Sequence, residues 1–157
     1  MFKCCLSLFL VIFVHASVHA EQTQISSVLD KFHQAASAAD SQQYFGLLTE
    51  SAVFIGTDST ERWDKTAFKA FAKPYFDKGQ GWTYVPRNRN VMIAESGKVA
   101  WFDELLDSQS YGECRGTGVL ELTSDGWKIS QYHLTIPMPN DVAKTLVKQI
   151  KQYHQSK

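Results

Sequence analysis

The chain has 157 residues, with 16 Lys and Arg against 16 Asp and Glu and a formal net charge of zero at neutral pH. This length suits one domain and is too short for two of ordinary size. The balanced charge, with no long run of like-charged residues, argues against nucleic acid or an anionic membrane surface as a partner.

The first 20 residues have the pattern of a secretory signal peptide. Lys3 precedes an almost wholly apolar run over residues 6–14, and Val18 and Ala20 are small residues just before a polar segment that begins at Glu21. The apolar run is shorter than the roughly 20 residues that span a bilayer, so a cleaved signal is favoured over a permanent anchor. We therefore expect cleavage after Ala20 and a periplasmic or secreted protein of residues 21–157.

Removal of 20 residues from 157 leaves a mature chain of 137. Cys4 and Cys5 leave with the signal, so Cys114 is the one cysteine that remains and cannot form an intramolecular disulfide. We expect neither a metal nor a cofactor, because glycine-rich phosphate loops are absent and ligand spacing is missing among the mature histidines, His33, His133 and His154.

Helical spacing of apolar residues predicts a helix over residues 25–40 and a short second helix over 42–48. A strand follows over 52–56 and a polar loop over 57–63. Asp64 can cap a third helix that buries Phe68, Phe71, Ala72 and Tyr75. Pro74 should bend or break its last turn.

From residue 82 the apolar period changes to that of strands. Four strand-like runs cover residues 82–94, 98–106, 113–123 and 127–136, and turn signals at 96–97 and 124–126 indicate an antiparallel meander. A last helix over about 141–153 should be capped by Asn140 or Asp141. Helices followed by a long meander predict an α+β fold, with helices packed on one face of a curved sheet.

Side-chain alternation in the last strand predicts a cavity. Trp127, Ile129, Gln131 and His133 should share one face, which changes along the strand from apolar to polar. Such a change is typical of a strand that runs from a packed core into a cavity with hydrogen-bonding groups. We therefore expect His133 to line a cavity.

The run over residues 98–106 is apolar on both faces, with Asp103 on one face and Glu104 on the other. We expect helices to cover one face and a second copy of the chain to cover the other, which predicts a homodimer. A buried carboxylate needs a partner, and Arg115 on the next run is the expected one. The pair could be structural, or the acid could instead form an acid/base dyad with His133.

The loop over residues 57–63 gathers the charged residues Asp58, Glu61 and Arg62 beside Trp63. Burial of Trp63 would draw these residues toward the cavity mouth. The alternative is that they serve local turn hydrogen bonds, with Arg62 in solvent.

Several local segments, the element order and a final strand of the form Gly-Trp-Lys-Ile-x-x-Tyr-His resemble the SnoaL-like branch of the nuclear transport factor two superfamily, over about residues 27–139. The segments are Phe54-Ile55-Gly56-Thr57-Asp58, Glu61-Arg62-Trp63, Phe102-Asp103-Glu104, Cys114-Arg115-Gly116 and Gln131-Tyr132-His133-Leu134. The resemblance implies a cone-shaped fold with a mainly apolar cavity at its wide end and frequent dimerisation through the sheet. The superfamily includes isomerases, cyclases, dehydratases and proteins without catalysis, so the fold does not decide the function.

Three functions follow as hypotheses. The leading one is an exported domain that binds a small apolar or aromatic molecule in the cone cavity. The alternatives are a cofactor-free isomerase, cyclase or dehydratase that transfers protons, and a non-catalytic dimeric interaction module whose own side chains fill the cavity. The candidate catalytic residues are His133, Asp58 and Asp103, and the candidate pocket residues are Glu61, Arg62, Trp63, Trp101, Glu104, Arg115, Gln131 and Tyr132.

Overall fold

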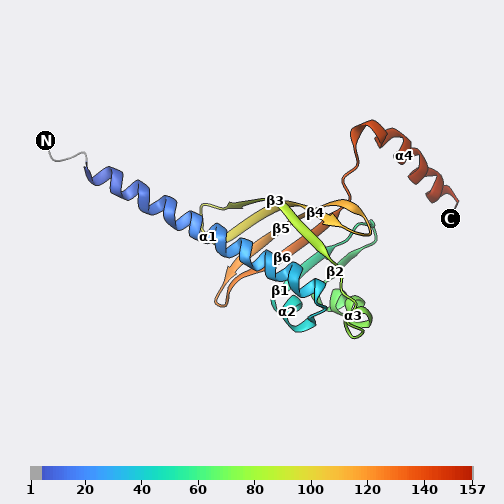
Figure 1. Ribbon diagram of the computed structural model, residues 1–157, viewed down its shortest axis with the longest axis horizontal. Coiled ribbons are helices and arrows are strands. Elements are labelled where there is room, and N and C mark those ends of the chain that lie inside the picture. The colour runs from blue at the N-terminus through green and yellow to red at the C-terminus, as the bar shows by residue number, and fades with distance from the viewer. Residues whose placement is uncertain (1–4, 157) are drawn as a thin grey trace.

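The computed structural model describes residues 5–156, with side chains from residue 19 onward. Within these residues, six strands form one sheet in the order β2-β1-β6-β5-β4-β3. Figure 1 shows α1 crossing the sheet, α2 and α3 grouped at one end of α1, and α4 standing away from the body. The elements are α1 (Cys5–Ser37), α2 (Ser41–Gly46), β1 (Leu48–Ile55), β2 (Arg62–Asp64), α3 (Lys65–Phe76), β3 (Tyr84–Ile93), β4 (Val99–Ser108), β5 (Gly112–Thr123), β6 (Gly126–Thr135) and α4 (Asn140–Gln155).

The meander is confirmed: β3, β4, β5 and β6 pair antiparallel in sequence order. β1 lies beside β6 and runs parallel to it. The end of the expected loop forms β2, which pairs antiparallel with β1 and sets Trp63 opposite Phe54. A three-residue strand is too short to show an alternating pattern, so the sequence indicated a loop there.

Helix α1 packs its apolar stripe onto the inner face of the sheet. Ile25, Leu29, Phe32 and Ala36 recur at helical spacing and are at most 2% exposed.

The helix is continuous through Ala20, where cleavage is expected. Residues 1–4 of the expected signal peptide, and its side chains up to residue 18, lie outside the described part. Among the described residues, no helix is long and apolar enough to cross a membrane.

Helix α3 begins as predicted, with the Asp64 carboxylate accepting a hydrogen bond from the Ala67 amide at 2.8 Å. Pro74 lies inside the helix, which continues to Phe76. The helix buries Phe68, Ala72 and Phe76. The expected burial of Phe71 and Tyr75 is wrong, because these side chains are 42% and 48% exposed and point toward a cavity instead of the core.

Helix α4 is present as predicted, but its expected cap is not. Asn140 is its first helical residue, and Pro139 occupies the cap position without a side-chain hydrogen bond. The helix buries none of its residues. Its larger apolar side chains stay exposed, namely Val142, Val147, Ile150 and Tyr153.

Two bulges decide which side chains of the sheet face inward. In β6 the register passes from Ile129 opposite Leu120 to Gln131 opposite Val119, so Ser130 is an extra residue. In β3 the register shifts between Arg87 and Asn90, where Asn88 has φ 48°. Each extra residue reverses the alternation beyond it, because side chains alternate with a period of two.

Candidate functional site

A cavity with a volume of about 460 Å³ lies between α3, the β1–β2 connection, the segment entering β3 and the β4–β5 turn. This size is within the usual range for small-molecule sites. Eight of the described lining residues are aromatic, namely Phe54, Trp63, Phe68, Phe71, Tyr75, Trp82, Tyr84 and Tyr111. The cavity is open, so it is not filled by the protein's own rings.

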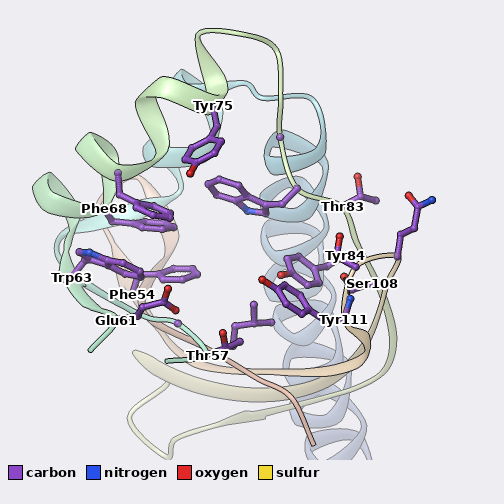
Figure 2. A pocket seen from close by; sticks show the side chains of 17 residues that line it. Phe54, Thr57, Glu61, Trp63, Phe68, Tyr75, Thr83, Tyr84, Ser108 and Tyr111 are labelled. Carbon is purple, nitrogen blue, oxygen red and sulfur yellow. Dashed lines mark hydrogen bonds between the residues drawn. The ribbon is translucent and has the colours of Figure 1, made fainter. Parts of the chain in front are cut away.

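One wall is a stack of rings from three elements. Phe54 of β1 stacks on Phe68 of α3 with centroids 3.9 Å apart and planes 12° apart. Trp63 of β2 lies 4.9 Å from Phe71, with planes 26° apart. Figure 2 shows Phe54, Trp63 and Phe68 facing Tyr84 and Tyr111 across the cavity. Stacked rings from separate elements hold one another in place, so this wall is largely preformed.

Glu61 brings a carboxylate to the aromatic cavity, and Figure 2 shows it pointing inward. The turn before β2 fixes its position: the Gly56 amide donates to the Glu61 carbonyl at 2.9 Å, and the Asp58 amide donates to Glu61 Oε2 at 3.2 Å. Gly56 permits this close approach, since a Cβ at position 56 would collide with the Glu61 side chain as it lies here.

Tyr84 supplies a hydroxyl group on the opposite wall. Burial raises the pKa of Tyr84 to about 12, and the neighbouring Cys114, Tyr111 and Glu61 add smaller contributions in the same direction. The hydroxyl therefore stays protonated at neutral pH and can donate a hydrogen bond. Together with Glu61 as an acceptor, it gives the cavity polar groups of both kinds.

A second polar group lies in the core and does not line the cavity. The Glu104 carboxylate, 0% exposed, contacts His33 Nε2 at 2.6 Å and Arg89 Nε at 2.7 Å. Arg89 also bonds Asp30 of α1 at 2.7 Å and the Ser26 carbonyl at 2.9 Å. These bonds join α1 to β3 and β4, which indicates a structural clamp.

The clamp corrects the expected partner of the buried acid. Glu104 does need an arginine, but Arg115 lies exposed on the outer face of β5, opposite Leu105 and Thr135. Arg89 takes its place because the Asn88 bulge turns Arg89 inward, whereas Arg87 points outward to Asp107 and Glu113. The sequence showed no signal for this reversal.

The expected position of His133 is also corrected. The Ser130 bulge turns Tyr132 and Leu134 inward, where they are 3% and 7% exposed, so His133 and Gln131 point to the outer face. His133 is therefore not among the cavity-lining residues. Tyr132 itself is buried among Phe32, Phe54 and Phe102 and lies in the core, beneath the cavity wall.

The other predicted residues divide between the cavity, the surface and the outer sheet face. Glu61 and Trp63 line the cavity. Asp58 is exposed and accepts hydrogen bonds from the amide and hydroxyl of Thr60 at 2.8 and 2.7 Å, as the local-turn alternative predicted, and Arg62 is exposed. Trp101 and Asp103 lie on the outer face of β4, where Asp103 accepts from Asn90 at 3.1 Å.

Sequence reasoning missed several cavity residues. Phe71 and Tyr75 share the apolar stripe of α3 and were assigned to the core, because a helical stripe does not distinguish packing from cavity lining. Tyr84, Ser108 and Tyr111 come from strand ends and a turn, where no spacing pattern links them. In the described part of the chain, no group of three or more His, Cys, Asp or Glu could hold a metal ion.

The arrangement of helices packed on a curved six-stranded sheet agrees with the comparison with known proteins. The family model of the SnoaL-like domain matches residues 25–139. The chain belongs to the SnoaL-like domain family. This SnoaL-like match begins after the expected cleavage site and ends before α4. No curated protein matches the chain significantly.

Solved structures resemble this SnoaL-like protein at low sequence identity and therefore show the fold alone. A domain of unknown function with a cystatin-like fold from Nostoc punctiforme is 15% identical with a TM-score of 0.67, covering 87% of this chain and 96% of that one. An NTF2-like protein of unknown function from Pseudomonas putida is 16% identical with a TM-score of 0.66, covering 79% and 92%. A provisionally named dehydratase of the NTF2-like family from Streptomyces avermitilis is 13% identical with a TM-score of 0.64, covering 77% and 99%.

Proposed function

We propose that this SnoaL-like protein binds a small molecule with an apolar or aromatic body in the cavity of about 460 Å³. The observation that carries the proposal is the open cavity with eight aromatic side chains among its described lining residues. Aromatic walls with a few fixed polar groups are typical of small-molecule sites. The interaction-module hypothesis required a filled cavity, and the open cavity does not favour it.

The proton-transfer hypothesis has less support. It relied on His133, which lies on the outer face, and on one of three acids that do not line the cavity, namely Asp58, Asp103 and Glu104. Glu61 and Tyr84 could orient a polar ligand group, with Glu61 as acceptor and Tyr84 as donor. Binding is therefore the function that the geometry supports best.

Binding is tested by titrating the purified protein with a panel of small aromatic alcohols, carboxylates and amines, followed by tryptophan fluorescence and calorimetry. Phe71→Ala, which removes a wall residue 42% exposed, should weaken the best binder by about 10-fold. Leu122→Ala is the matched control, because Leu122 is 43% exposed and lies away from the cavity. Failure of the whole panel to bind at millimolar concentration would contradict the proposal.

We also propose that the protein is exported and loses residues 1–20. The charged, apolar and small-residue pattern of this segment supports the proposal, as does a family match that begins at residue 25. N-terminal sequencing of the protein from the periplasm or medium should return Glu21. Recovery of Met1 from an exported fraction would contradict cleavage.

A homodimer through the outer sheet face is a further proposal. Met92, Val99 and Trp101 lie together on β3 and β4 and are 38%, 37% and 43% exposed. An apolar patch of this kind favours association with another copy. Sedimentation equilibrium should show a dimer that Trp101→Lys converts to a folded monomer. A concentration-independent monomer for the unaltered protein would refute it.

A further inference from the structure

The cavity carries a negative charge, from the Glu61 carboxylate, in addition to its aromatic lining. Of the described residues that line it, Glu61 alone carries a formal charge at neutral pH. Thr57, Thr83, Ser108, Gln109 and Ser110 add neutral polar groups, and the remaining lining is aromatic, aliphatic or glycine.

The Glu61 carboxylate is not neutralised within the described chain. Its hydrogen bond comes from the Asp58 amide, and no lysine, arginine or histidine forms an ion pair with it among residues 19–156. By contrast, Glu50 pairs with Lys65 at 2.8 Å and Glu113 pairs with Arg87. A neutral ligand that covered Glu61 would remove water from an uncompensated charge, which is costly.

Aromatic rings also favour a positively charged ligand. The faces of Trp, Tyr and Phe carry partial negative charge and attract organic cations, with Trp the strongest. Trp63, Trp82 and Tyr84 line the cavity together with Glu61, and Figure 2 shows Trp63 and Tyr84 on opposite sides of it. In the stack, Phe54 and Phe68 turn their faces to one another, as do Trp63 and Phe71. The Glu61 carboxylate is therefore the main attraction for a positive group, and any ring face that the ligand contacts adds to it.

From this arrangement we infer that the cavity selects a small organic cation, namely an amine or quaternary ammonium attached to an apolar or aromatic body. The inference rests on the proposed binding function and names the class of its ligand. The carboxylate of Glu61 pairs with the ammonium group, the rings surround its alkyl substituents, and the aromatic stack holds the apolar body.

The test compares two probes of the same shape that differ in charge, (4-hydroxyphenyl)trimethylammonium and 4-tert-butylphenol, by calorimetric titration of the purified protein. The cation should bind at least about 10-fold more tightly than the neutral probe. Glu61→Gln should remove about 10-fold of the affinity for the cation, whereas the affinity for the phenol should stay the same or rise. Glu50→Gln, an exposed carboxylate outside this cavity, is the control and should change neither.

Salt dependence gives a second readout on the unaltered protein, which decides the matter if Glu61→Gln does not fold. Rising salt should weaken binding of the cation and leave that of the phenol unchanged, because salt screens the charge pair. Equal affinity for both probes, tighter binding of the phenol, or salt-insensitive binding of the cation would overturn the inference while the binding function stands. If neither probe nor any compound of the wider panel binds, the proposed function fails and the inference fails with it.

Discussion

Glu104 and Glu61 are carboxylates of one small fold, but their surroundings differ. Glu104 is fully buried and bonded to His33 and Arg89, at 2.6 and 2.7 Å. The Glu61 carboxylate lines an open cavity and accepts one hydrogen bond, from the Asp58 amide at 3.2 Å. The Glu104 carboxylate is already paired within the protein, and these bonds hold α1 to the sheet. The Glu61 carboxylate has no such partner among the described residues, so its charge is available to a ligand.

The aromatic residues divide in the same way. Tyr44, Phe32 and Tyr132 are at most 3% exposed, and Phe32 packs against both tyrosines in the core. Phe71 and Tyr75 are more than 40% exposed at the cavity. The same residue types therefore serve the core and the cavity in this protein. The extent of burial, and the presence of a partner for a charged group, distinguish the residues that stabilise the fold from those that could bind a ligand.

The largest expected effect comes from breaking the core clamp. Glu104→Ala leaves Arg89 and His33 buried without their carboxylate, so it should lower the free energy of unfolding by about 3–5 kcal/mol. Glu113→Ala, which breaks an exposed pair, should cost less than about 1 kcal/mol. Urea denaturation measures both, and similar values for the two variants would contradict the comparison.

Two adjacent aromatic residues of α3 test whether core and cavity residues of one helix have different roles. Phe76→Ala should cost about 3–5 kcal/mol of unfolding free energy, because Phe76 is 6% exposed. Tyr75→Ala should cost less than about 1 kcal/mol, since Tyr75 is 48% exposed, but it should weaken ligand binding. Thermal melts and titration on both variants distinguish the roles; a Tyr75→Ala variant as unstable as Phe76→Ala would remove the distinction.

Gly116 tests how tightly the core is packed. A Cβ at this position would collide with the Tyr132 hydroxyl and lie 3.2 Å from Glu104, so Gly116→Ala should destabilise the protein by about 1–3 kcal/mol. The Tyr132 hydroxyl has no hydrogen-bond partner among the described residues, and Tyr132→Phe should relieve the collision without loss of a bond. In a double-mutant cycle, additive effects of the two changes would show that the collision is not the cause.

The smallest expected effect concerns alkaline pH at the cavity. The folded pKa of Tyr84 is about 12, above its ordinary value of 10. The folded state therefore holds this proton more tightly, so Tyr84 contributes stability below pH 10 that is lost as pH rises toward 12. Tyr84→Phe should reduce the loss of stability over this interval by at most about 2 kcal/mol. Identical pH profiles for the variant and the unaltered protein would contradict the assignment.

Several features could be predicted from sequence because they depend on neighbours along the chain. Apolar periodicity located the helices and the four strands of the meander, and Asp64 marked the start of α3. The apolar strand around Glu104 predicted a buried acid that needs an arginine. Trp63 predicted that its charged neighbours lie at the cavity; Glu61 and Trp63 do line it, whereas Asp58 and Arg62 do not.

The remaining features were decided by the tertiary structure. One extra residue at Ser130 turned His133 outward, and one at Asn88 turned Arg89 inward to Glu104. A bulge of one residue leaves the composition of a strand unchanged, but it reverses every side chain beyond it. The walls of the cavity likewise come from the β1–β2–α3 segment and from the β4–β5 turn, which are distant from each other in sequence. The sequence by itself determined the elements and the kinds of residues in them. The pairing of strands determined which residues meet. The face to which a side chain points depends on the register with the neighbouring strand, and local periodicity does not encode that register.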